Sequence, residues 1–216
     1  MDRPEIIQKT AGFIAREFAS EGSGHDWFHV DRVRRMAIRI GSIEGSDLFV
    51  TEMAALLHDL DDWKMTGAGS PFSEKAKKWL SDLDVEAEVS SRILNVIDEV
   101  SFKGAGVKTP VMTVESAVVQ DADRLDAIGA IGIARTFTYG GHKNRLIYDP
   151  VIVPVLHDDF QAYQKSNAPT INHFFEKLLL LKDRMNTNTG KLIADQRHRF
   201  MENYLGQFFD EWDAKI

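Results

Sequence analysis

The chain has 216 residues, of which 44% are hydrophobic and 27% charged, a composition that suits one well-packed globular domain. Its formal net charge of −7 argues against a broad surface for nucleic acid or an anionic membrane, because such surfaces need clustered positive charge. Cysteine is absent, so any metal must be held by His, Asp and Glu. The charged first ten residues do not resemble a secretory signal, and no apolar run is long enough to span a bilayer, so we expect a cytoplasmic protein.

Apolar residues recur at helical spacing nearly throughout the N-terminal part of the chain. The pattern predicts a first helix over about 4–19 and a second over about 26–43, with Asp26 as its N-cap. Asp47 can cap a third helix over 48–63, which is apolar on most sides and is therefore expected to be central.

Two glycine-rich stretches then interrupt the helical pattern. Residues 65–72 (MTGAGSPF) and 101–110 (SFKGAGVKTP) are predicted to be loops. Between them, a short helix is expected from Ser73, and a longer one over 85–100.

The C-terminal half continues the pattern. Residues 114–137 are predicted to form one buried helix, in which Gly129 and Gly132 indicate close helix–helix approach or room for a ligand. Residues 138–154 form a polar excursion and a candidate lid, and the run 151–155 (VIVPV) is the only strand-like segment. Further helices are expected over about 155–166, 170–186 and 190–213. The predicted fold is all-α, with residues 1–216 in a single domain.

Three His-Asp dipeptides can each supply an imidazole and a carboxylate to a metal: His25-Asp26, His58-Asp59 and His157-Asp158. The first is explained by helix capping with a histidine at the rim of a site, and the third by a helix start. His58-Asp59 ends a buried apolar run, where an ionised carboxylate needs a strong partner. A metal would supply that partner, and Asp62 returns to the same helix face. The alternative is a core histidine beside an Asp that serves a neighbouring helix end.

Three fragments together resemble a known signature. His29 in HVDRV, His58-Asp59 in LLHDLDD and a later Asp in QDADRLDAIG look like the H…HD…D pattern of the HD-domain metal-dependent phosphohydrolases. The longer strings GHDWFHVDRV, LLHDLDDWK and DADRLDAIGAIGIARTF resemble the YpgQ-like nucleotide pyrophosphohydrolase branch. The resemblance covers about residues 25–130, and extends less distinctively into the helices of about 155–213.

The resemblance implies a helical bundle of the HD type around one divalent ion. Its ligands would be His29, His58, Asp59 and one acid chosen from Asp121, Asp123 and Asp126. Related proteins carry the last ligand in an Ala-Asp-x-Leu context, which favours Asp123, with Asp121 as the second choice. Mixed imidazole and carboxylate ligation suits Mn²⁺, Fe²⁺, Ni²⁺, Co²⁺ or Zn²⁺, and phosphate chemistry suits Mn²⁺ or Mg²⁺, so Mn²⁺ is the first choice.

Further roles follow from the resemblance and from charge. Asp62 matches the acid that is often catalytic after the HD pair, and we assign it to orient or deprotonate the attacking water. A polyphosphate needs nearby cations, and Lys64 is the first candidate. The weaker candidates are Arg32, Lys103 and Arg124.

These observations predict a hydrolase that cleaves (deoxy)nucleoside triphosphates to a monophosphate and pyrophosphate. The sequence has no GxxxxGK[ST] segment, so the chemistry would depend on the metal rather than on a P-loop. The alternatives are a nucleotide phosphomonoesterase or phosphodiesterase, a non-catalytic nucleotide-binding HD protein, and a helical scaffold. The expected partner is a small nucleotide, with no nucleic acid polymer and no membrane, for a monomer or homodimer.

Overall fold

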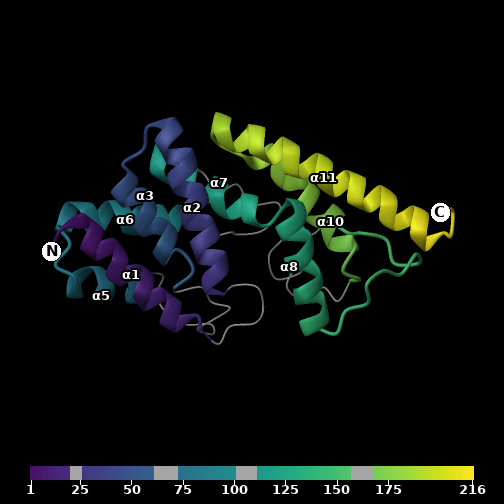
Figure 1. Cartoon of the computed structure of the whole chain (residues 1–216), viewed down its shortest axis with the longest axis horizontal. Helices are drawn as coiled ribbons and strands as arrows, with labels where there is room; N and C mark the ends of the chain where they lie inside the picture. The colour runs from purple at the N-terminus through teal and green to yellow at the C-terminus, as the bar shows by residue number, and fades with distance from the viewer. Residues whose placement is uncertain (20–25, 61–72, 101–110, 157–167) are drawn as a thin grey trace. The chain divides into compact units, whose positions relative to one another are not determined.

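The computed structural model describes residues 1–19, 26–60, 73–100, 111–156 and 168–216. These residues form helices joined by turns, and no strand occurs among them, which confirms the all-α fold class (Figure 1). In chain order the elements are α1 (Arg3–Glu17), α2 (Trp27–Glu44), α3 (Leu48–Leu57), α5 (Glu74–Asp82), α6 (Ala87–Val100), α7 (Val114–Asp126), α8 (Gly129–His142), α10 (Asn172–Glu176), the 3-10 helix η1 (Leu178–Arg184) and α11 (Asn188–Trp212).

The chain divides into two compact units. One consists of Met1–Phe102 and Lys108–Asp123, and the other of Lys103–Val107 and Arg124–Ile216. Each unit has buried apolar side chains of its own, such as Ile14 in the first and Phe174 in the second. The interpretation of the whole chain as one domain stays a prediction.

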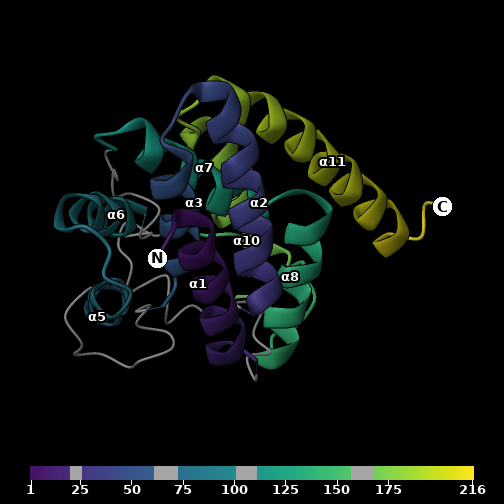
Figure 2. The ribbon, with the colours of Figure 1, turned by 60° about the vertical axis from the view of Figure 1, so that its left-hand side comes forward.

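Helix α3 is the central element of the first unit. It packs against α1, α2 and α6 (Figures 1 and 2), and most of its side chains are buried, as its nearly unbroken apolar sequence predicts. The Asp47 carboxylate accepts hydrogen bonds from the backbone N–H groups of Phe49 and Val50, which confirms the predicted N-cap. The helix itself ends at Leu57, and residues 58–60 form a turn rather than the continuation expected from the pattern.

The single helix predicted over 114–137 is wrong, because α7 ends at Asp126 and α8 begins at Gly129. Gly129 has a φ of 77°, a left-handed conformation that favours glycine and interrupts the helix. A Cβ on Gly129 would lie 3.0 Å from the Arg197 side chain of α11, and one on Gly132 would lie 2.2 Å from the Ala127 carbonyl oxygen. Close approach to α11 therefore explains Gly129, and the turn between α7 and α8 explains Gly132.

In the second unit, α8 packs against the long helix α11 (Figure 2). The helix predicted over 170–186 is divided into α10 and η1 at Lys177, and residues 138–142 of the predicted excursion are the last turn of α8. The expected helix of about 155–166 falls almost wholly outside the described residues. Within the described part of the chain, no helix combines the length and the hydropathy needed to cross a membrane.

Candidate metal centre

His29 lies in the first turn of α2, and a local cap sets its position. The Asp26 carboxylate accepts a hydrogen bond of 2.8 Å from the His29 backbone N–H, which confirms Asp26 as the N-cap. This bond fixes where α2 begins, and therefore which side of the helix carries His29. The imidazole is completely buried.

His58 follows the last residue of α3, and its ring folds back onto the final turn of that helix. Its Nδ1 lies 2.8 Å from the carbonyl oxygen of Ala55. Since a carbonyl oxygen only accepts, the neutral imidazole in this orientation carries its proton on Nδ1 and its lone pair on Nε2. Nε2 is buried and makes no hydrogen bond within the described structure. A buried, oriented lone pair of this kind is what a histidine offers to a metal.

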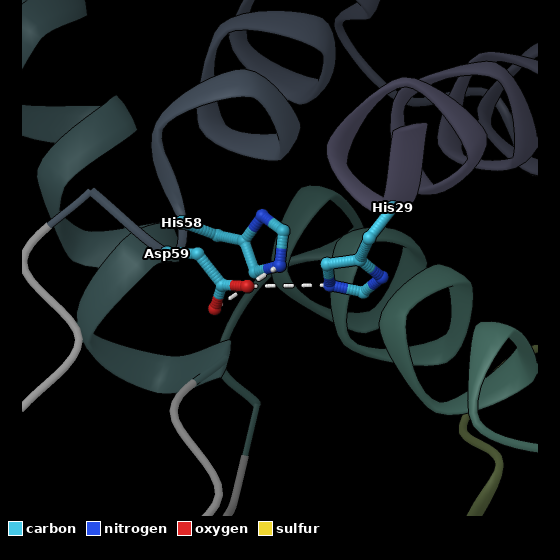
Figure 3. Close-up of side chains that lie close together, drawn as sticks. All are labelled: His29, His58 and Asp59. Atoms are coloured by element: carbon cyan, nitrogen blue, oxygen red, sulfur yellow. Dashed lines mark ion pairs between the residues drawn. The ribbon is translucent and has the colours of Figure 1, made fainter. Parts of the chain in front are cut away.

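The two imidazoles and Asp59 point toward one another (Figure 3). The Asp59 carboxylate lies 3.2 Å from His29 Nε2 through one oxygen and 3.4 Å from His58 Nε2 through the other. One ligand atom from each of the three residues falls within 4.8 Å of the others. Ligands about 2.1 Å from one ion would lie about 3 Å apart when adjacent and about 4.2 Å apart when opposite. The three side chains therefore fit a single divalent ion.

Asp123 reaches the same point from α7. Its Oδ1 lies 3.6 Å from His29 Nε2 and 3.8 Å from His58 Nε2, so the structure brings this acid to both imidazoles. The sequence offers two other acids of α7 for this position. Asp121 is fully buried, and the Asp126 carboxylate pairs with Arg135 at 2.8 Å. The geometry thus supports the choice of Asp123, although its role as a ligand stays a prediction.

The sequence predicts five further side chains at this site. Asp62, Lys64 and Lys103 lie outside the described residues, and so do His25 and the His157-Asp158 pair. Arg32 is half-buried on α2, one turn after His29. Arg124 donates a hydrogen bond to the carbonyl oxygen of Arg184, a structural contact within the second unit. Substrate binding by these side chains stays a prediction.

Sequence reasoning missed an ion pair that holds α2 and α3 together. The Arg34 guanidinium donates from two nitrogens to one oxygen of Glu52, both at 2.7 Å. Its NH1 also lies 3.3 Å from Asp31. Arg34 follows His29 on α2 and Glu52 precedes His58 on α3, so the pair fixes the two helices that carry the imidazoles. The sequence shows only a charged residue within a predicted helix, and this does not identify the residue with which it pairs.

Comparison with known proteins agrees with this geometry. The HD domain family model matches residues 27–128, a span that contains all four of the converging side chains. The chain is 42% identical over 189 residues to the YpgQ protein of Bacillus subtilis, covering 87% of this chain and 84% of YpgQ. The chain belongs to the HD superfamily of hydrolases.

Solved structures of this superfamily share the fold. An HD-superfamily hydrolase from Bacillus thuringiensis is 45% identical, with a TM-score of 0.78 over 99% of this chain and all of that one. The crystal structure of B. subtilis YpgQ in complex with ADP is 36% identical, with a TM-score of 0.76 over 95% of this chain and 97% of that one. The predicted resemblance to the HD family and to its YpgQ-like members is confirmed.

Proposed function

We propose that His29, His58, Asp59 and Asp123 hold one divalent metal ion, with Mn²⁺ as the first choice. The observation that carries this proposal is the His58 imidazole, whose buried Nε2 lies 3.4 Å from an Asp59 oxygen and 3.8 Å from an Asp123 oxygen. Two imidazoles with two carboxylates suit Mn²⁺ and its first-row neighbours. These four residues would hold the ion and would leave it able to take a water molecule and a phosphate oxygen.

We propose that this centre hydrolyses nucleoside triphosphates between the α and β phosphates, releasing a monophosphate and pyrophosphate. Three findings support this activity: membership of the HD hydrolase superfamily, the likeness to YpgQ, and the structure of YpgQ with ADP. When bound, the ion would lower the pKa of a water molecule and offset charge that develops on phosphorus.

The chain's own residues would supply the remaining chemistry. Asp62 would accept the proton of the attacking water as a general base. Lys64, with Arg32, Lys103 and Arg124 as further candidates, would neutralise the phosphate oxygens, since a triphosphate brings several negative charges to one site. These roles come from the sequence, and each can be tested by substitution.

A substrate panel with product identification tests the proposed activity. The chelator-treated protein is incubated with Mn²⁺ and individual ribo- and deoxyribonucleoside triphosphates, and phosphorus NMR identifies the products. We expect monophosphate and pyrophosphate in equal amounts. Release of orthophosphate from a nucleoside monophosphate would instead identify a phosphomonoesterase, and absence of turnover with bound metal would indicate a nucleotide-binding protein.

Two variants separate metal binding from proton transfer. Asp59→Ala should lose both the metal and the activity, because it removes a proposed ligand. Asp62→Ala should keep the metal and lose turnover. Full turnover by Asp62→Ala would refute the general-base assignment.

A further inference from the structure

A cluster of three charged residues joins the beginnings of α3 and α7. The backbone N–H of Asp47 donates a hydrogen bond of 2.9 Å to Glu115 Oε1 in the first turn of α7. Arg92 of α6 lies 3.1 Å from Asp47 Oδ2 and 3.7 Å from Glu115 Oε1. Asp47 Oδ1 meanwhile caps α3. We refer to Asp47, Arg92 and Glu115 as the start cluster.

The same two helices also meet at their far ends. His58 follows the last residue of α3, and its Nε2 lies 3.8 Å from Asp123 Oδ1, in the last turns of α7. The two helices therefore run in the same direction from the start cluster to the metal centre. At an axial rise of 1.5 Å per residue, Asp47 and His58 lie about 16 Å apart along α3, and Glu115 and Asp123 lie about 12 Å apart along α7.

Small errors in the alignment of these helices would disable the metal centre. A slip of one residue moves a helix by about 1.5 Å and turns a side chain by about 100°. Metal–ligand distances tolerate deviations of only about 0.2 Å. Asp123 can thus join His29 and His58 around one ion at a single axial position of α7.

The chain connectivity leaves α7 dependent on noncovalent contacts for that position. Helices α2 and α3 are joined by a short turn and by the Arg34–Glu52 ion pair. Helix α7 instead follows α3 only after α5 and α6. Glu115 is buried, Asp47 is half-buried and Arg92 is exposed, so water screens the hydrogen bond from Asp47 to Glu115 less than it screens the contacts of Arg92.

We propose that the start cluster is a positioning device, which holds α7 at the axial position where Asp123 completes the metal centre. Glu115 is its principal residue, since it accepts from the Asp47 backbone and attracts Arg92. The inference rests on the metal centre proposed above, but it does not depend on the substrate or on the reaction.

Metal affinity is the measurement that tests the device. Mn²⁺ is titrated calorimetrically into the chelator-treated full chain, and Glu115→Ala should weaken binding by about tenfold, at the lower end of the range for partners of metal ligands. Glu115→Gln keeps an acceptor for the Asp47 N–H and should recover most of the affinity. Arg92→Ala should give an intermediate loss.

Thr10→Val serves as the matched control. Thr10 accepts a hydrogen bond from the Trp79 indole and donates one to the Ile6 carbonyl, so its loss weakens α1 and its contact with α5 while leaving the three residues of the start cluster in place. Thr10→Val should therefore lower the unfolding midpoint of the metal-free protein while keeping wild-type Mn²⁺ affinity.

The outcomes separate the two proposals. Wild-type Mn²⁺ affinity in a folded Glu115→Ala protein, or an equal loss in Thr10→Val, would overturn the positioning role. If Glu115→Ala does not fold, the comparison is made with Arg92→Ala, and wild-type affinity in that variant would overturn the role. An intact wild-type protein that binds Mn²⁺ but releases no pyrophosphate would instead refute the proposed activity and leave the device standing.

Discussion

Free Mn²⁺ should stabilise the folded protein, and the increase in stability per tenfold rise in Mn²⁺ depends on the number of bound ions. For one site that binds only the folded state, each tenfold rise in free metal above the dissociation constant adds about 1.4 kcal/mol to the free energy of unfolding. The entropy of unfolding for 216 residues is about 450 cal/mol/K, at about 2.1 cal/mol/K per residue. The unfolding midpoint should therefore rise by about 3 °C per tenfold increase in free Mn²⁺.

Thermal unfolding followed by circular dichroism, across metal-buffered solutions, measures this slope. Should the two compact units unfold separately, the shift would belong to the unit with the metal centre, and would be about twice as large because fewer residues unfold. Two bound ions would also double the slope, so calorimetric stoichiometry distinguishes these cases. Asp59→Asn replaces a proposed carboxylate ligand by a neutral amide and should greatly reduce the shift.

A wild-type unfolding midpoint that stays constant from about 10 μM to about 1 mM free Mn²⁺ would refute the proposed metal site. The site would equally be refuted if the unfolding midpoint of Asp59→Asn rose with Mn²⁺ as much as that of the wild type, because the stabilising ion would then be bound elsewhere.

Three further predictions concern individual side chains. Asp123→Asn should weaken Mn²⁺ binding at least about tenfold, whereas Asp121→Asn should mainly lower folding stability; calorimetry giving the opposite order would make Asp121 the ligand. Arg34→Ala should lower the free energy of unfolding by about 2 kcal/mol in urea denaturation, because it leaves the largely buried Glu52 carboxylate without its guanidinium; a loss within error would show that the pair contributes nothing. Burial, with Lys177 and Arg145 nearby, lowers the pKa of His173 to about 3, so below its unfolded pKa of 6.5 only the unfolded chain takes up this proton. Stability should fall as pH decreases from 6.5 towards 3, less steeply in His173→Gln; identical slopes would contradict this.

Local interactions made much of the site predictable from the sequence. Asp26 and Asp47 cap their helices through bonds to N–H groups two or three residues away, so each cap could be expected from its own segment. The apolar run of α3 likewise indicated a buried helix that would carry His58-Asp59 into the core. These features depend on short stretches of chain, which a periodic pattern describes well.

Contacts between distant segments could not be predicted in the same way. The break at Gly129 depends on a left-handed residue that packs against Arg197, and the pattern of apolar residues passes through it unchanged. The hydrogen bond from the Asp47 backbone N–H to Glu115 joins residues far apart in the sequence, and nothing in either segment indicates its partner. The orientation of the His58 ring could not be predicted either, because it follows from a contact between Nδ1 and the Ala55 carbonyl oxygen that forms only in the folded chain.

The central claim is that α2, α3 and α7 hold one divalent ion between His29, His58, Asp59 and Asp123. Anomalous diffraction from crystals grown with Mn²⁺ tests it most directly, since it locates the ion without reference to activity. We predict a single peak within about 2.0–2.4 Å of both Nε2 atoms and of an oxygen from each of the two acids. A peak at other residues, or one that Asp121 rather than Asp123 contacts, would contradict the claim.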